Sequence, residues 1–93
     1  MIEVTSVRFS GRPDGEFLSF ATVILDGCFV INNLRLIQLE QSGRRMLSMP
    51  RRKRADGKWE DVVHPIRTDF RTHLEQQVFD AYDKQVRQSA DGS

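Results

Sequence analysis

Hydrophobic and polar positions follow one period along the first two thirds of the chain and another along the last third. Before residue 64, short runs rich in β-branched and aromatic residues alternate with clusters of glycine, aspartate and serine. Short runs bounded by turn residues are typical of antiparallel strands. We therefore predict strands over residues 2–9, 17–25, 45–49 and 58–63, and a further strand that starts with residues 29–31, in a run that goes on to Leu34 and Leu36.

Beyond residue 65 the apolar residues recur at steps of three and four, which is the period of an amphipathic helix. The apolar stripe covers about five turns and consists of Phe70, Leu74, Val78, Ala81, Tyr82 and Val86. Strands first and a helix last predict an α+β fold, an antiparallel β-sheet of about five strands followed by one long C-terminal α-helix packed on it.

The sequence offers two starting points for this helix, one turn apart. Thr68 or Asp69 would serve as the N-cap, because each offers a side-chain oxygen to the free amides of the first turn. Thr72 with Glu75 matches a capping box one turn later.

Four turn signals place glycine where a turn needs a positive φ. They lie at residues 13–15, 26–27, 42–43 and 55–57. The sharpest is Asp26-Gly27, because it joins two runs of strand-forming residues with almost nothing between them. We expect a tight two-residue hairpin there.

Alternation within two of the predicted strands changes phase. In the first, the apolar positions shift between Val4 and Val7, and in the third they shift around Asn32 and Asn33. Bulges would explain both shifts. Strands buried on two faces, or a strand break at the asparagines, would explain them equally well.

Length and composition predict one folded domain. The chain has 93 residues, of which 39% are hydrophobic and 29% charged. We assign residues 1–88 to a single domain and residues 89–93 to a disordered tail. No run of 18 apolar residues predicts a membrane span, and the first residues lack the features of a signal peptide. With one cysteine only, we expect a cytoplasmic protein without a membrane partner.

Residues with catalytic or metal-binding chemistry are few and scattered. Cys28, His64 and His73 share no ligand spacing, and no histidine is near Cys28 in sequence to activate it. His64 precedes Pro65, where a histidine most often makes a structural hydrogen bond. We expect no metal, no cofactor, no small-molecule substrate and no enzymatic activity, unless the fold brings Cys28 and His64 together.

Positive charge is concentrated in one stretch. Seven of the 14 basic residues but one of the 13 acidic residues lie between Gln41 and Lys58. The stretch therefore carries a net charge of +6 and the remainder of the chain −5. Such asymmetry in a small domain indicates a site for an anionic partner.

The centre of this stretch is a run of four cations between Pro50 and Asp56-Gly57. Four adjacent cations repel one another, so we expect a solvent-exposed loop between two strands. The arginine fork suits phosphate oxygens, and nucleic acid is the expected partner. A merely solubilising loop is the alternative. Contact with about five phosphates would give a logarithmic salt slope of roughly −4 to −5.

The predicted nucleic-acid contacts are Arg51, Arg52, Lys53, Arg54 and Lys58, with Arg44, Arg45 and Arg71 as secondary candidates. Trp59 is either a platform for base stacking or a core residue, since Val62 and Val63 follow it. This interpretation requires the cations to stand free in water, unpaired with carboxylates of the same chain.

The same stretch resembles the bacterial stage V sporulation protein G (SpoVG, or septation protein) family. Residues 49–66 show its pattern of Met-Pro, a basic loop, Asp-Gly, an aromatic residue, Asp and His-Pro-Ile. Residues 3–8, 25–30 and 34–37 support the resemblance, which extends from Met1 to about Gln88.

The resemblance implies a small dimeric protein that binds DNA and RNA and regulates gene expression, linked to septation and, in spore formers, to sporulation. Residues 51–54 occupy the family's basic loop. The chain departs from the family at Arg54-Ala55, where Thr-Pro is usual, and at Asn33, where Asp is common. The first departure makes the loop more basic and less rigid, and we expect these departures to affect affinity and sequence preference more than fold.

Two functions are compatible with these patterns. The first is a nucleic-acid-binding regulator whose homodimer presents two basic loops and makes mostly backbone contacts. The alternative is a protein-interaction module of the cell-division or septation machinery, whose acidic protein partner takes the basic loop. For the dimer contact we expect an exposed strand edge.

Overall fold

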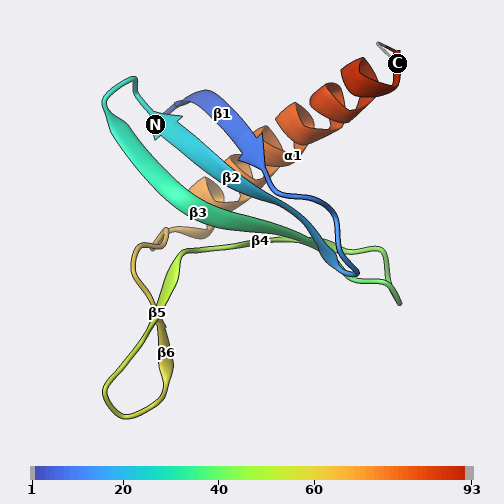
Figure 1. Cartoon of the computed structure of the whole chain (residues 1–93). Helices are drawn as coiled ribbons and strands as arrows, with labels where there is room; N and C mark the ends of the chain where they lie inside the picture. The colour runs from blue at the N-terminus through green and yellow to red at the C-terminus, as the bar shows by residue number, and fades with distance from the viewer. Residues whose placement is uncertain (1, 92–93) are drawn as a thin grey trace.

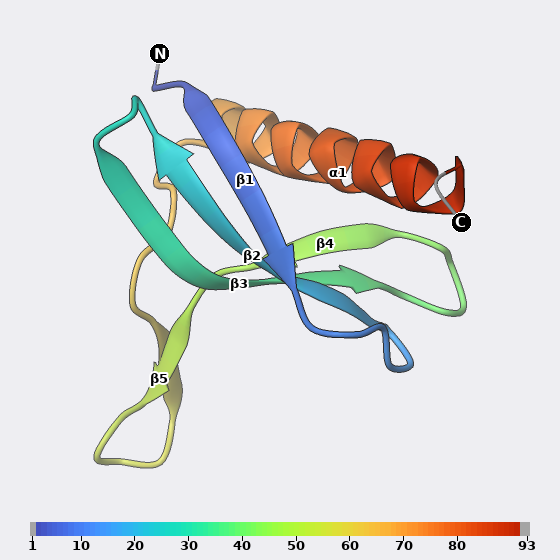
Figure 2. The same ribbon diagram turned by 45° about the horizontal axis from the view of Figure 1, so that its top comes forward.

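Four antiparallel strands form a curved sheet in the order β1-β2-β3-β4, and helix α1 lies across one face of it (Figures 1 and 2). A computed structural model describes residues 2–91, with the side chains of residues 2–87. The elements are β1 (Val4–Ser10), β2 (Phe17–Leu25), β3 (Phe29–Gln38), β4 (Arg45–Ser48), β5 (Arg51–Lys53), β6 (Trp59–Asp61) and α1 (Thr68–Asp91). The α+β prediction is confirmed, although the strands divide into a sheet of four and a hairpin of two.

The chain reverses between β2 and β3 at Asp26-Gly27 as predicted, but Leu25 pairs with Phe29, so the loop has three residues rather than the two expected. Cys28 N donates to the carbonyl oxygen of Leu25 at 3.0 Å. Asp26 and Gly27 have φ values of 50° and 65°. Positive φ at both residues gives the turn the twist of the flanking strands, and Cys28 is the third residue of the loop.

Both phase changes in the alternation are bulges. The β1–β2 register shifts between Val4 and Ser6, which gives β1 one extra residue. The β2–β3 register shifts where Ala21 pairs with Leu34 and Val23 with Ile31, so β3 carries the extra residue near its asparagines. Asn33 has a φ of 65°, a region that asparagine adopts more readily than most residues. Strand β3 therefore continues through the asparagines without a break.

The core lies between the sheet and α1. Its buried apolar residues are Ala21, Val23, Leu34, Leu36, Leu47, Met49, Leu74, Val78 and Phe79. Strand β1 joins the same packing, because the Phe9 and Tyr82 rings meet edge to face at 5.5 Å. The predicted helical stripe is correct for Leu74 and Val78 but wrong at its end, since Val86 is 48% exposed. It also omitted Phe79, which is buried beside Val78.

Helix α1 begins at Thr68. Arg71 N donates to the carbonyl oxygen of Arg67 at 3.1 Å, so Arg67 occupies the capping position that we had predicted for Thr68, Asp69 or Thr72. Asp69 instead accepts a hydrogen bond from Phe70 N at 2.9 Å within the first turn. A negative charge at this end of the helix interacts favourably with the helix dipole.

At its other end the helix continues to Asp91, into the segment 89–93 predicted to be a tail. Gly92 and Ser93 lie outside the described residues.

The strands around the basic run differ from the prediction. β4 pairs with β3 rather than with the returning strand, and Arg51–Lys53, predicted to be loop, is strand β5 paired with β6. Pro50 separates β4 from β5, and its carbonyl oxygen accepts from Val62 N at 2.8 Å. Cations can occupy this strand because both faces of a two-stranded ribbon lie in water. The chain reverses where Arg54 N donates to the carbonyl oxygen of Lys58 at 2.7 Å.

Candidate nucleic-acid interface

The β5–β6 hairpin, residues 51–61, projects from the sheet away from α1 (Figures 1 and 2). Its pairs are Arg51 with Asp61, Arg52 with Glu60 and Lys53 with Trp59. Every residue from Arg51 to Trp59 is exposed. The hairpin thus holds its cations on a regular ribbon that solvent reaches from both sides.

Two of the arginines form ion pairs with the residues directly opposite them. Arg51 Nε lies 3.2 Å from Asp61 Oδ1, and Arg52 Nε lies 2.7 Å from Glu60 Oε1. Opposite charges at facing positions stabilise an antiparallel pair. These contacts explain why a run of cations adopts a strand.

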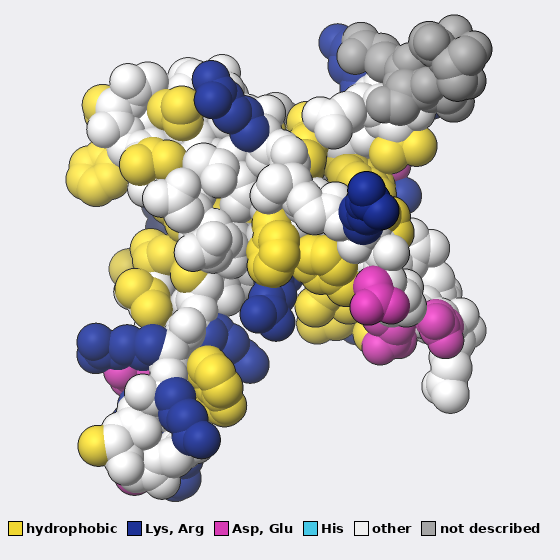
Figure 3. Space-filling view, viewed as in Figure 1, with side chains coloured by type: hydrophobic (Ala, Val, Ile, Leu, Met, Phe, Trp, Pro, Cys, Tyr) yellow, Lys and Arg dark blue, Asp and Glu magenta, His cyan; other side chains and the backbone are white. Residues whose placement is uncertain are grey.

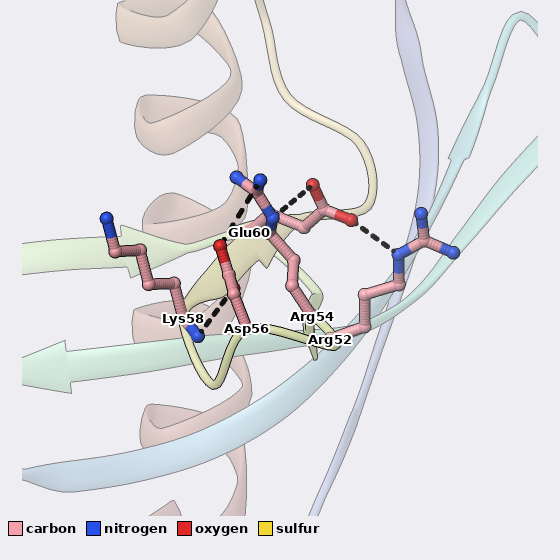
Figure 4. A network of polar contacts seen from close by, with 5 residues as sticks. All are labelled: Arg52, Arg54, Asp56, Lys58 and Glu60. Atoms are coloured by element: carbon pink, nitrogen blue, oxygen red, sulfur yellow. Dashed lines mark hydrogen bonds and ion pairs between the residues drawn. The ribbon is translucent and has the colours of Figure 1, made fainter.

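A third arginine completes a small network at the tip of the hairpin (Figure 4). Arg54 Nη2 lies 3.4 Å from Asp56 Oδ2, and Arg54 Nε lies 4.0 Å from Glu60 Oε2. Glu60 therefore lies between Arg52 and Arg54 and shares its two carboxylate oxygens between them.

These contacts correct the expectation that the cations stand free of the chain's own carboxylates. The hairpin carries five cations, but Asp56, Glu60 and Asp61 reduce its net charge to +2. The basic stretch counted from Gln41 to Lys58 did not include two of these three carboxylates, those of Glu60 and Asp61. All three paired arginines keep more than half of their side chains exposed. Exposed ion pairs contribute about 0–1 kcal/mol, so phosphate oxygens can replace the carboxylates at small cost.

Lys53 and Lys58 make no ion pair with any residue the structure describes. Lys58 N donates to Asp56 Oδ1 at 3.0 Å, while the Lys58 side chain points away from the network (Figure 4). Lys53 lies opposite Trp59. Both ammonium groups are available to an anion without breaking a contact.

The secondary candidates lie elsewhere. Arg44 and Arg45 stand at the start of β4, with the length of that strand between them and the hairpin (Figure 1). Arg45 Nη1 pairs with Asp83 Oδ2 at 2.8 Å, and its guanidinium lies over the Phe79 ring, 5.3 Å from the centroid. Arg71 is half-buried in the first turns of α1. Arg45 therefore joins the sheet to the helix.

The Arg45–Asp83 contact shifts the pKa of both side chains. The hydrogen bond from Arg45 lowers the pKa of Asp83, against a smaller opposing effect of burial. The same hydrogen bond raises the pKa of Arg45. Both groups are charged at neutral pH, as an ion pair between strand and helix requires.

Trp59 is not a core residue, because 61% of it is exposed. It lies beside an open groove of about 1400 Å³ between the hairpin and β3. The groove is also lined by Phe29, which is 70% exposed, and by Arg35 and Arg51. Figure 3 shows hydrophobic and basic side chains gathered along this side of the molecule.

Sequence reasoning missed Phe29 and Arg35 as residues of this groove. Phe29 follows the tight turn and resembled an ordinary strand residue. Arg35 alternates with the buried Leu34 and Leu36, so it lies on the sheet face away from α1. That alternation was readable in the sequence, but the position of the hairpin opposite it was not.

The residues considered for catalysis or metal binding lie in three different parts of the chain, a turn, the segment before α1, and α1 itself. Cys28 is exposed at the β2–β3 turn. His64 Nδ1 lies 3.1 Å from the carbonyl oxygen of Pro65, a local backbone hydrogen bond of the predicted kind. His73 Nε2 lies 3.9 Å from a Glu3 carboxylate oxygen.

Residues 2–91 contain neither a metal-binding cluster nor a membrane-spanning helix. No group of three or more His, Cys, Asp or Glu side chains there is placed to hold a metal ion. No helix in that range combines the length and apolarity needed to cross a membrane.

Fold and site together define a class: a small α+β domain whose sheet carries a projecting ribbon rich in cations. The SpoVG family model matches residues 2–84. The chain belongs to the SpoVG family.

Relatives cover almost all of the chain, and each carries the description "Putative septation protein SpoVG". The Myxococcus xanthus protein is 31% identical over 98% of this chain and 90% of its own length. The Anaeromyxobacter sp. (strain Fw109-5) protein is 30% identical over 96% and 90%. The Treponema denticola protein is 33% identical over 89% and 88%. The description names a role in septation and no reaction.

Proposed function

We propose that this protein is a non-enzymatic regulator that binds DNA or RNA through the β5–β6 hairpin and acts in gene expression and septation. The observation that carries the proposal is the hairpin itself, a ribbon that projects from the domain with five exposed cations. The naming of its relatives as septation proteins supports the link to cell division. In a spore-forming host the same regulator would act in sporulation.

Binding begins with the two lysines that are not paired. Lys53 and Lys58 attract the phosphate backbone at long range, because no described carboxylate neutralises them. Arg51 and Arg52 then exchange their carboxylates for phosphate oxygens, since each guanidinium has further N–H groups beyond the Nε used in its ion pair. The hairpin recognises mostly the phosphate backbone of the nucleic acid. The apolar face of α1 packs against the sheet, so this helix does not serve as a recognition helix.

The proposal includes a homodimer. Two hairpins on one particle bind far more tightly than either alone when one nucleic acid spans both. The outer edges of β1 and β4 are open edges of the sheet and offer the contact that we propose. Sedimentation at micromolar concentration should show twice the mass of the single chain, and the mass of one chain would remove this part of the proposal.

The alternative function, a septation module with an acidic protein partner, is favoured by the apolar side chains around the groove. Ile2, Val30 and Val62 are each about half exposed or more and line it. Such a partner would bury aliphatic surface, so its affinity would persist at high salt, whereas phosphate binding falls steeply with salt.

The test of the proposed function is a pair of variants with equal loss of charge. One replaces Arg51, Arg52, Lys53 and Arg54 with Ala. The other replaces Arg8, Arg12, Lys84 and Arg87, exposed cations outside the hairpin, with Ala.

The hairpin variant should lose binding to DNA and RNA oligonucleotides while the control variant retains it. The melting temperatures should stay near that of the original protein, since none of these eight side chains is buried. Equal loss in both variants would reduce the effect to net charge and contradict the proposal.

A further inference from the structure

The Trp59 ring stands in water on an element that has no layer packed behind it. Trp59 belongs to β6 of the two-stranded hairpin, and it is the only tryptophan in the chain. A core tryptophan would be enclosed, whereas this ring is 61% exposed. Contiguous exposed apolar surface marks a binding site, and Trp59 shares its groove with the exposed side chains of Phe29 and Val62.

Cations surround this ring. Lys53 lies directly opposite Trp59 in the β5–β6 register. Arg51 is on the same face of β5 as Lys53, because alternate residues of a strand share a face. Trp59 and Arg51 both line the groove between the hairpin and β3. A ligand on the ring therefore meets positive charge on the same side of the ribbon.

The opposite wall of the groove repeats this combination. Phe29 is 70% exposed at the start of β3, and Arg35 lies further along the same strand. Asn32 adds a side-chain amide between them. Against these cations, Asp26 is the one acidic residue that lines the groove. The lining thus offers aromatic faces, guanidinium groups and an amide to one ligand.

This chemistry fits a nucleic-acid strand with exposed bases. Base faces stack on aromatic rings, phosphates meet cations, and amides hydrogen-bond base edges. A duplex hides its base faces and would leave Trp59 in water. We propose that the ligand of the hairpin is single-stranded nucleic acid, with one base stacked on Trp59 and the strand lying in the groove toward Phe29. This inference rests on the proposed function and specifies its ligand class.

A second copy of the chain is a less suitable occupant. A symmetric dimer brings the same patch of both subunits together. The Arg35 and Arg51 side chains of one copy would then approach those of the other, and although Asp61 pairs with Arg51, Arg35 makes no ion pair with any described residue. Like charges placed together in an interface are costly.

The single tryptophan makes a direct measurement possible. A dT oligonucleotide of 12 residues, its rU counterpart and a 12-base-pair duplex are titrated into the protein while Trp59 fluorescence is recorded. Affinities of the original protein, W59A, W59F and the control I66A are measured in parallel by anisotropy of a labelled strand. Ile66 is the matched control, because it is exposed but does not line the groove.

Both single strands should quench Trp59 fluorescence, and the duplex should not. W59A should lose about 5- to 150-fold in single-strand affinity, the range that one stacked base contributes. W59F and I66A should retain most of it. The salt slope of W59A should be unchanged, because the substitution removes no charge.

Each contrary result is distinct. Binding that W59A leaves unchanged would overturn the stacking inference and leave phosphate binding by the hairpin intact. Failure of all three nucleic acids to bind would remove the proposed function itself. Trp59 fluorescence that changes with protein concentration alone would show that a second copy covers the ring, which overturns the inference.

Discussion

At the scale of single residues, Glu60 decides how much of the hairpin's charge is available. Its carboxylate lies 2.7 Å from Arg52 and 4.0 Å from Arg54, so it occupies the place that a phosphate would take. Charge counted along the sequence could not show this, because the neutralising residue comes from the returning strand. The basic composition of the segment was predictable, but its pairing was not.

Glu60→Gln should strengthen nucleic-acid binding several-fold. The change frees Arg52 for phosphate, while Arg54 still lies 3.4 Å from Asp56, so the logarithmic salt slope steepens by up to about 0.9 for duplex DNA. Affinity measured at several salt concentrations tests this. Glu40→Gln makes the same change of net charge in the loop after β3. An equal gain from that control would assign the effect to overall charge.

The ion pair of Arg45 with Asp83 predicts a pH dependence of stability. Because the folded-state pKa of Asp83 is lowered, the contact contributes stability above the unfolded pKa of about 3.9 and loses it as pH falls through the folded value. Asp83→Asn should therefore lower the melting temperature at pH 7 and have less effect near pH 3. A difference that stays constant between these pH values would contradict the assignment.

At the scale of elements, the sequence predicted where the hairpin turns but not where it begins. Asp56-Gly57 marked the reversal, and Gly57 has a φ of 87°. Strand β5 escaped prediction because a run of like charges resembles a loop until its cross-strand carboxylates are placed. The sequence left three explanations open for the two phase changes, and bulges were one of them. The apolar pattern of one strand does not reveal the cause of a phase change until the pairing with the neighbouring strand is known.

Gly57→Ala should weaken nucleic-acid binding while leaving the melting temperature of the domain almost unchanged. No atom crowds a Cβ at this position, so the cost is backbone strain of about 1–2 kcal/mol that opens the hairpin locally. Faster amide exchange at Arg54, whose N–H closes the hairpin, would report the opening.

Gly27→Ala is the matched control, because it introduces the same strain into the turn of the main sheet. This variant should lower the melting temperature and leave the hairpin ordered. A larger fall in melting temperature for Gly57→Ala than for Gly27→Ala would show that the hairpin supports the fold.

At the scale of the whole molecule, the change of period at residue 65 was sufficient to predict a sheet covered by one helix. The same pattern could not show that β4 pairs with β3 while β5 and β6 stand apart. Strand pairing depends on tertiary contacts such as Leu47 with the core, which periodicity within one strand does not encode. The groove exists because the hairpin stands apart from the sheet. The residues of β3 that line it could therefore not be predicted from the sequence.

The molecule consists of a packed domain and a projecting ribbon, and we expect these two parts to supply folding stability and binding energy separately. The domain is held by apolar burial, to which the hairpin adds no buried residue. The hairpin carries exposed charge, whose interactions weaken with salt. Stability and binding should therefore respond independently to substitutions in the two parts.

The most direct test of the account is the salt dependence of nucleic-acid affinity between about 50 and 200 mM. We expect a logarithmic slope for duplex DNA between about −2, where Lys53 and Lys58 alone meet phosphates, and about −4 to −5, where the three arginines join them. The variant with Ala at positions 51–54 keeps Lys58 as the one remaining cation of the hairpin and should show a slope no steeper than about −1. Binding by the original protein that does not change with salt would contradict the claim that this hairpin recognises phosphate.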